Sequence, residues 1–357
     1  MDLYFTTAVS ILKGVICSSF SAQGAGPDTA GPALAFVIVN WNGGAFLRRA
    51  VASILQFPPR VAFEIVIVDN ASVDGSLAWL RSDELKRQLG GIRLRVIENA
   101  SNLGFGLANN QAFAFTHAPF LFLLNADSEL REGTCDALID SLGSDDRIGV
   151  CGPRIVNPDG SLQISVWRNP PSAWSILLTG FKLHRLLPRR LRGELLLAEH
   201  WRHDRRRDVG MLAGAALLVR REVIETVGGF DNRFHMYGED NEWCLRTKRA
   251  GWRLLFEPAA LVMHHGGQSS GQRWTELERM RVQLEAFFLF QRCCLNRRQR
   301  VANLLALSIV FASQLMWRRL LRRPTQRVSL ALQLHLADLR RTLRSPSPRK
   351  PHELPAE

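Results

Sequence analysis

Four short apolar runs, each ending in polar residues, recur between residues 34 and 127 with helical stretches between them. They are Leu34–Asn40, Glu64–Asp69, Arg93–Glu98 and Pro119–Leu124. Continuous apolar runs that alternate with helices are typical of a mostly parallel sheet covered by helices on both faces. The sequence therefore predicts an α/β protein with a Rossmann-like sheet. An apolar content of 46% is ordinary for a globular chain, so wholesale disorder is excluded.

Polar side chains lie at or just after the end of each predicted strand: Asn40, Asp69, Asn102 and Asp127. In parallel sheets, ligands bind at the carboxyl ends of the strands. For any one of these residues, capping the next helix or building a turn is the better explanation. Four of them at one edge of a sheet instead favour a ligand site.

Residues 103–109 contain a G-x-G pattern formed by Gly104 and Gly106. A dinucleotide fingerprint requires a third glycine, where this chain has Asn109, and belongs to the first strand rather than the third. A nicotinamide oxidoreductase is therefore disfavoured. Two glycines that open a helix still permit close approach of the backbone to a phosphate or a base. No Walker A sequence occurs, which excludes a P-loop nucleotidase.

Two acidic positions are candidates for catalysis or metal binding. Asp127 ends a buried strand, where a carboxylate can bind a hard divalent cation whose other ligands are substrate phosphates. It could equally cap the segment that follows. Glu239 and Asp240 begin a predicted helix, where acids favour the helix dipole. Because Trp243 and its neighbours bury one side of that helix and aim its amino end inward, a carboxylate there could also act as a general base.

A pair of histidines, His264 and His265, precedes two glycines. A lone histidine is usually structural or lies at the surface. A pair in this setting could supply an imidazole ligand to a metal or a contact to a phosphate.

Taken in order, these motifs resemble the family 2 inverting glycosyltransferases of the GT-A fold. The likeness is closest to bacterial rhamnosyltransferases that use dTDP-L-rhamnose in building cell-surface polysaccharide. It covers about residues 33–270, roughly two-thirds of the chain. The stretches that carry it are Val37–Asn42, Val68–Ser76, Asn102–Asn110, Leu124–Asp127, Gly228–Asp231 with Tyr237–Asp240, Ala250–Trp252 and His264–Ser269.

The resemblance implies a role for each matching position. Asp127 becomes the last residue of a metal-binding D-x-D motif whose first position is Asn125 here, and His264 completes a site for Mg²⁺ or Mn²⁺. Asp240 becomes the catalytic base, and Glu239 and Trp243 are expected to contact the acceptor. The residues expected to bind the donor nucleotide are Asn40, Asp69, Asn70, Asn102, Gly104, Gly106 and Asn125.

The formal net charge of +13 is concentrated near the carboxyl end, where residues 292–350 hold 14 Lys or Arg and a single acid, Asp338. A second basic patch runs from Lys182 to Arg207. Such patches favour an anionic partner, either a membrane or nucleic acid. The apolar run Leu304–Trp317 has 14 residues, fewer than the ~20 of a spanning helix. A helix lying in the headgroup region, or one packed on the body, is expected instead.

The predicted organisation has four parts. Residues 1–32 form a poorly ordered extension, and residues 33–275 form the GT-A domain, with a nucleotide-sugar half (33–130) and an acceptor half (131–275). Residues 276–345 form a basic amphipathic helical tail, and residues 346–357 a disordered end.

The predicted function is metal-assisted, inverting transfer of L-rhamnose from dTDP-L-rhamnose to a lipid-linked cell-surface glycan. The enzyme is expected to be cytoplasmic and peripheral on the inner face of the cell membrane, held there by anionic lipid rather than by nucleic acid. The alternatives are another donor (UDP-glucose, UDP-galactose or UDP-N-acetylglucosamine) and a non-catalytic module that binds a nucleotide sugar. The acceptor, the linkage and the oligomeric state are not encoded in any motif.

Overall fold

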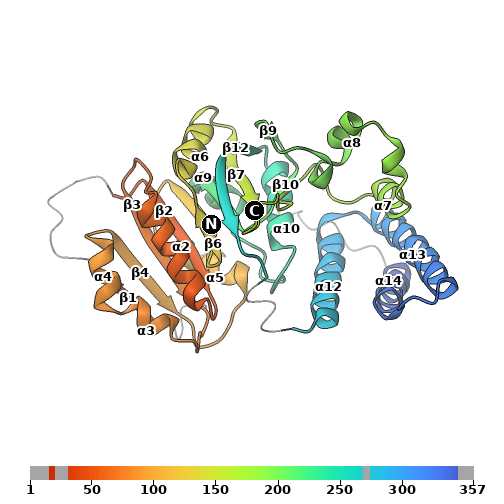
Figure 1. Cartoon of the computed structure of the whole chain (residues 1–357), viewed down its shortest axis with the longest axis horizontal. Coiled ribbons are helices and arrows are strands. Elements are labelled where there is room, and N and C mark those ends of the chain that lie inside the picture. Colours follow the sequence, from red (N-terminus) through yellow and green to blue (C-terminus); the bar gives the residue numbers. More distant parts are fainter. Residues whose placement is uncertain (1–15, 21–30, 268–273, 345–357) are drawn as a thin grey trace, which may run out of the picture. The chain divides into compact units, whose positions relative to one another are not determined.

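The computed structural model describes residues 16–20, 31–267 and 274–344 (Figure 1). These residues form two compact units. The first contains the described residues up to Val166 and those from His203 to 267, and the second contains Trp167–Arg202 and the described residues from Trp274 onward. Residues 167–202, predicted to belong to the acceptor half, thus group with the C-terminal helices.

One large sheet forms the centre of the first unit. Its strands follow the order β1-β4-β3-β2-β5-β11-β7-β12-β6, and β9 pairs with β12. Their bounds are β1 (Ile16–Phe20), β2 (Leu34–Asn40), β3 (Phe63–Asp69), β4 (Arg93–Glu98), β5 (Phe120–Asn125), β6 (Ser128–Leu130), β7 (Ile148–Val156), β9 (Arg207–Asp208), β11 (Ala216–Arg220) and β12 (Arg253–His264). Two further short strands are β8 (Val166–Trp167) and β10 (Met211–Leu212).

Strands β4, β3, β2 and β5 run parallel to one another, as the sequence predicts. Beyond β5 the direction changes, because β11 is antiparallel to both β5 and β7. Strand β12 is parallel to β7 and antiparallel to β6. Strand β1 lies in the segment predicted to be a poorly ordered extension, and it pairs antiparallel with β4. The remaining predictions for residues 1–30 and 346–357 lie outside the described residues.

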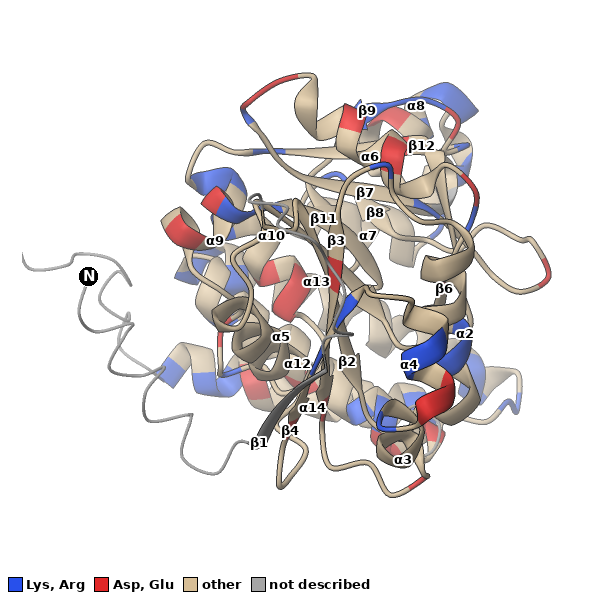
Figure 2. Cartoon of the chain, turned by 90° about the vertical axis from the view of Figure 1, so that its left-hand side faces the viewer, with Lys and Arg blue, Asp and Glu red and all other residues tan. Residues whose placement is uncertain are grey.

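Helices fill the connections of the first unit. They are α2 (Gly44–Gln56), α3 (Ser76–Leu80), α4 (Asp83–Leu89), α5 (Phe105–Ala114), α6 (Thr134–Gly143), α9 (Arg221–Val227) and α10 (Glu239–Arg249). Local sequence explains their ends. In α4, Ser82 Oγ accepts from the backbone N–H of Leu85, acids occupy the first turn and Lys86 and Arg87 the last (Figure 2). Both charge placements favour the helix dipole.

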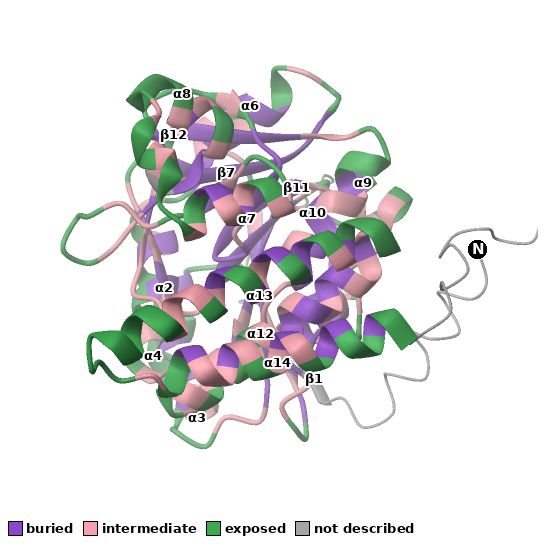
Figure 3. Ribbon diagram, turned by 90° about the vertical axis from the view of Figure 1, so that its right-hand side faces the viewer, coloured by how far each residue is buried: buried purple, intermediate pink, exposed green. Residues whose placement is uncertain are grey.

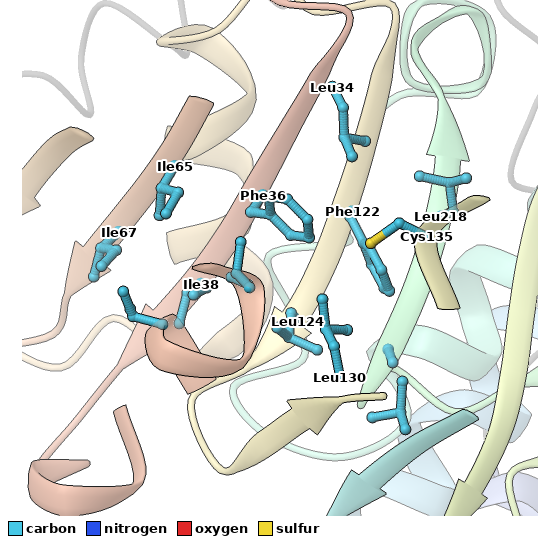
Figure 4. Packing of buried hydrophobic residues seen from close by; sticks show 14 of the residues in the cluster. Leu34, Phe36, Ile38, Ile65, Ile67, Phe122, Leu124, Leu130, Cys135 and Leu218 are labelled. Carbon is cyan, nitrogen blue, oxygen red and sulfur yellow. The ribbon is translucent and has the colours of Figure 1, made fainter. Parts of the chain in front are cut away.

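Alternate residues of the central strands point to opposite faces of the sheet. Leu34, Phe36 and Ile38 of β2 join a core that contains side chains of α2, α3, α4 and α6. The ring of Phe36 stacks on that of Phe122, with centroids 5.4 Å apart. Figure 4 shows this core continuing through residues of β5, β6 and β11, so the predicted nucleotide and acceptor halves share one hydrophobic core.

The second unit is helical. Its elements are α7 (Ala173–Gly180), η1 (Leu183–Leu186), α8 (Arg189–Leu196), η2 (Ala198–His200), α12 (Glu276–Cys294), α13 (Arg297–Leu320) and α14 (Gln326–Arg344). Ile176 of α7 packs against Ala306 and Val310 of α13, and Gly180 allows this approach because a Cβ there would lie 2.5 Å from Val310. An ion pair of 2.7 Å between Arg292 and Asp338 joins α12 to α14.

Helix α13 has 24 residues and is therefore longer than the apolar run that suggested it. Among the described residues it is the one helix long and apolar enough to cross a membrane, with a mean hydropathy of 1.3 over 18 residues. Only 28% of that window is buried, and buried and exposed residues alternate along the helix (Figure 3).

Candidate active site

The register of the parallel strands brings several predicted site residues to one edge of the sheet. Asn40 at the end of β2 lies opposite Asp69 at the end of β3. On its other side, Val39 of β2 lies opposite Asn125 at the end of β5. The predicted gathering of polar side chains at the carboxyl edge is therefore what the structure shows.

Asn40 and Asp69, however, are fully buried and bonded to each other. Asn40 Nδ2 donates to Asp69 Oδ2 at 2.7 Å, and the backbone N–H of Ser72 donates to Asp69 Oδ1 at 2.8 Å. Asn70 is also buried, donating to Gly104 O at 3.2 Å and accepting from Asn99 at 2.8 Å. These three side chains stabilise the turns at the edge, as the turn-building alternative suggested, and they are buried from solvent in this conformation.

The two glycines that open α5 serve close packing between chain segments. Gly104 has a φ of +86°, and a Cβ there would lie 2.3 Å from the carbonyl oxygen of His235. A Cβ at Gly106 would lie 3.0 Å from Phe230 Cβ. Both glycines are buried, whereas Asn102, whose Oδ1 accepts from the Gly104 N–H at 2.9 Å, is partly exposed. Asn102 thus stays a candidate for donor contact, and the glycines shape the turn behind it.

The amino end of α10 holds the acidic pair. Asp240 is partly exposed, and its carboxylate is fixed by backbone donors: Gly214 N–H to Oδ2 at 2.9 Å and Asn241 N–H to Oδ1 at 2.7 Å. Burial raises the pKa of Asp240, while the backbone hydrogen bonds oppose that rise. A carboxylate with a raised pKa is a stronger base than an exposed aspartate, and this one has a fixed orientation.

The neighbouring Glu239 is buried, and its Oε2 has no hydrogen-bond partner among the described residues. Burial, and after it the charge of Asp240, raises the pKa of Glu239 to about 8. Glu239 is therefore protonated at neutral pH. Of the two acids, Asp240 is the one whose side chain is accessible from solvent.

Trp243 was predicted to contact the acceptor, and its position does not allow this. The side chain is fully buried, its indole N–H donates to Gly228 O at 2.9 Å, and its ring lies 5.3 Å from that of Phe230. Trp243 belongs to the core that anchors α10. Burial likewise keeps Glu239 from direct contact with an acceptor in this conformation.

The predicted metal ligands lie together. Asp127 Oδ1 is 3.1 Å from His264 Nε2, and the two side chains are 15% and 13% exposed. Asn125 Nδ2 lies 3.4 Å from the same nitrogen. No group of three or more His, Cys, Asp or Glu side chains forms a metal cage within the described part of the chain. One carboxylate and one imidazole with access to solvent fit a divalent cation that takes its other ligands from water and phosphate oxygens.

Two residues that the sequence did not single out connect the acidic pair to these ligands. Gly214 donates to Asp240, and the carbonyl of the next residue, Ala215, accepts from Asn125 N–H at 3.0 Å and Ser128 Oγ at 3.2 Å. One short backbone segment therefore holds Asp240 and the residues on either side of Asp127, Asn125 and Ser128. The only signal in the sequence was the run of small residues Gly214-Ala215-Ala216 before an apolar strand.

Two models of known protein families match this chain. A model described as "Glycosyl transferase family 2" matches residues 35–228, more than half of the chain, and one described as "Glycosyl transferase family group 2" matches residues 196–337. The chain belongs to glycosyltransferase family 2. The resemblance, the GT-A fold class and the prediction of an enzyme that transfers a glycosyl group are thereby confirmed.

Curated relatives of this glycosyltransferase include two from Mycobacterium tuberculosis. The N-acetylglucosaminyl-diphospho-decaprenol L-rhamnosyltransferase is 31% identical over 258 residues, covering 67% of this chain and 78% of that protein. The pre-mycofactocin glycosyltransferase is 28% identical over 224 residues, covering 62% and 40%. Among solved structures, a mannosyltransferase of Pyrobaculum calidifontis aligns at 16% identity and a TM-score of 0.47, over 97% of this chain and 83% of that one. A TM-score this low transfers no detail of a site.

Proposed function

We propose that this glycosyltransferase moves L-rhamnose from dTDP-L-rhamnose onto a hydroxyl of a lipid-linked glycan, with inversion at the anomeric carbon. The identity of 31% to a relative named for L-rhamnosyl transfer to N-acetylglucosaminyl-diphospho-decaprenol supports both the sugar and the kind of acceptor. The observation that carries the chemistry is the segment Gly214-Ala215, which holds the carboxylate of Asp240 and the strand end beside Asp127 at one edge of the sheet.

In the proposed reaction, Asp240 is the general base. Its fixed carboxylate takes the proton of the acceptor hydroxyl while that oxygen forms a bond to the anomeric carbon. The bond between the anomeric carbon and the phosphate oxygen breaks in the same displacement, and the nucleoside diphosphate leaves with the electron pair. Positioned general bases contribute about 10²–10⁴-fold to the rate.

Asp127 and His264 would hold the divalent cation, Mg²⁺ or Mn²⁺. When bound, such an ion supplies positive charge to the diphosphate as it leaves. With one carboxylate in place of two, the chain's own contribution to metal binding is small. We therefore expect Asp127 and His264 to bind metal tightly only together with the nucleotide.

A donor screen tests the proposal. Purified enzyme, Mn²⁺ and a polyprenyl-diphosphate N-acetylglucosamine acceptor are combined with dTDP-L-rhamnose, UDP-glucose, UDP-galactose or UDP-N-acetylglucosamine, and the released nucleotide is measured. The expected result is fastest release from dTDP-L-rhamnose, dependent on acceptor. Faster release from a UDP-sugar would overturn the sugar assignment, and release from no donor would overturn the catalytic one.

The second unit supports a further part of the proposal, attachment to an anionic membrane surface. Four apolar side chains of α13 recur at helical spacing and are 47–70% exposed: Leu305, Ile309, Met316 and Leu320. They lie on the side of the helix opposite its buried residues Leu304 and Val310. Four exposed arginines lie at the C-terminal end of this apolar stripe and just beyond it: Arg318, Arg319, Arg322 and Arg323. An apolar face bordered by arginine suits a helix lying in the headgroup region of anionic lipid.

Vesicle sedimentation tests this attachment. The full chain should bind phosphatidylglycerol vesicles at low salt and be released at high salt. Replacing both Ile309 and Met316 by Glu, or both Arg319 and Arg323 by Glu, should weaken binding about tenfold or more, since each basic residue near the surface is worth about 1 kcal/mol. Arg87→Glu on α4 is the matched control. Equal sedimentation of all four proteins would contradict the attachment.

A further inference from the structure

A chain of hydrogen bonds leads from the loop after β7 to the proposed metal ligand His264. Ser161 Oγ donates to Asp159 Oδ1 at 2.6 Å, and Asn157 Nδ2 donates to Ser161 Oγ at 2.8 Å. Gln163 Nε2 donates to Asn157 Oδ1 at 2.9 Å, and Gln163 Oε1 lies 2.5 Å from His264 Nδ1. Asp159 sets the donor and acceptor roles in the whole series of hydrogen bonds, because an ionised carboxylate only accepts hydrogen bonds.

Asp159 is ionised at neutral pH, since the hydroxyl and backbone N–H of Ser161 lower its pKa. Ser161 therefore donates to it, Asn157 donates its amide N–H to Ser161, and Gln163 donates its own to Asn157. The oxygen of the Gln163 amide is then the atom that faces His264. An amide oxygen can only accept, so the proton of the neutral imidazole lies on Nδ1.

In the neutral ring, the other nitrogen of His264, Nε2, then carries the lone pair. It faces Asn125 Nδ2 at 3.4 Å and the carboxylate of Asp127 at 3.1 Å. A lone pair and a carboxylate oxygen at this separation repel each other unless a proton or a metal cation lies between them. This geometry provides two ligands with the correct protonation for a divalent cation.

The adjacent histidine, His265, has different partners and does not direct a ring nitrogen at Asp127. His265 uses its Nε2 to contact Glu129 Oε1 at 2.8 Å, and its ring packs on Phe46 with centroids 4.9 Å apart. Its backbone N–H donates to Asp127 O at 2.9 Å. Of the two, only His264 has its Nε2 directed at Asp127.

We propose that Gln163 is a positioning residue, which holds His264 in the Nδ1–H tautomer with the bare Nε2 directed at the cation site. Gln163 does not itself contact the cation or the substrate. The inference rests on the proposed function in that it assumes the cation bound by Asp127 and His264. The tautomer itself can be measured without any metal.

The first experiment is therefore NMR of the metal-free full chain labelled with ¹⁵N-histidine at pH 8, with the His264 signals assigned by loss in His264→Gln. Wild type should show a protonated Nδ1, because Gln163 Oε1 accepts from it. In Gln163→Leu the Nδ1 acceptor is lost, and the proton should move to Nε2, where Asp127 accepts it. Gln163→Glu retains an acceptor and should keep the wild-type tautomer.

The second experiment measures Mn²⁺ affinity by electron paramagnetic resonance in the presence of dTDP. Loss of an outer partner of a metal-bound histidine typically costs 10–100-fold in affinity, and we expect this loss in Gln163→Leu and little loss in Gln163→Glu. Gln88→Leu, an exposed position on α4, is the matched control and should bind as wild type does.

The outcomes separate this inference from the proposed function. If Gln163→Leu keeps both the tautomer and the Mn²⁺ affinity while His264→Ala loses affinity, the role of Gln163 is refuted and the metal site stands. If His264→Ala binds Mn²⁺ and dTDP as wild type does, the metal part of the proposed function is refuted. An unprotonated Nδ1 in the wild type overturns the inference directly.

Discussion

Two sets of polar residues lie at the same edge of the sheet, and the structure gives them different roles. Asn40 and Asp69 are fully buried and satisfy each other's hydrogen bonds. Asp127 and Asp240 are partly exposed, and the carboxylate of Asp127 faces an imidazole nitrogen of His264. Position at a strand end thus brings a residue to the site, while burial and bonding decide whether it can meet a ligand.

If the accessible residues act on the substrate and the buried ones do not, the largest effect on turnover is expected at Asp240. Asp240→Asn removes the proposed base but leaves an oxygen for one of its backbone donors, so kcat should fall about 10²–10⁴-fold with little change in thermal stability. Turnover is measured by nucleotide release at saturating donor. Asp83→Asn, an exposed acid on α4, is the control. Wild-type turnover in Asp240→Asn would show that another group is the base.

At Asp69 we expect a loss of stability instead. Asp69→Asn places an N–H where either the Ser72 amide or the Asn40 side chain now donates, which leaves a buried donor without an acceptor. The free energy of unfolding should fall by about 1–3 kcal/mol in urea titrations. The KM for the donor should stay near that of wild type. A raised KM with unchanged stability would instead mean that Asp69 contacts the nucleotide directly, and the comparison above would fail.

Glu239 lies next to Asp240 but is buried as Asp69 is, and its effect should be a dependence of folding stability on pH. Its pKa is raised to about 8 by burial, so between the ordinary glutamate value and pH 8 the folded chain retains a proton that the unfolded chain has lost. Stability should therefore decrease as pH rises through this window. Glu239→Gln has no carboxyl group to titrate at this position, so its free energy of unfolding should rise relative to that of wild type between pH 5 and pH 8. Urea titrations at both pH values measure the difference, and an equal change with pH in both proteins would contradict it.

The smallest effect is expected at Trp243. Trp243→Phe keeps a ring in the core but removes the N–H that donates to Gly228 O, at a cost of about 1 kcal/mol or somewhat more. The KM for the acceptor should not change, since the side chain is fully buried. A rise in that KM, measured at saturating donor, would restore the predicted acceptor contact.

The sequence by itself determined the parallel half of the sheet and the candidates at its edge. An apolar run followed by a polar residue is a local pattern, and it placed Asn40, Asp69 and Asp127 at strand ends before any contact was known. Asp240 and His264 were chosen from short motifs in the same way. In the structure, Gly214 and Ala215 hold Asp240 and the strand end beside Asp127, and His264 lies next to Asp127.

Only the tertiary structure decided the rest. The antiparallel insertion of β11, the grouping of residues 167–202 with the C-terminal helices and the burial of Trp243 depend on which distant segments pack together. Gln163 contacts His264 across 101 positions of the chain, and no spacing or composition near either residue signals that contact. Local patterns encode the direction and period of each element, whereas hydrogen-bond partners and burial arise from long-range packing, which a single sequence does not display.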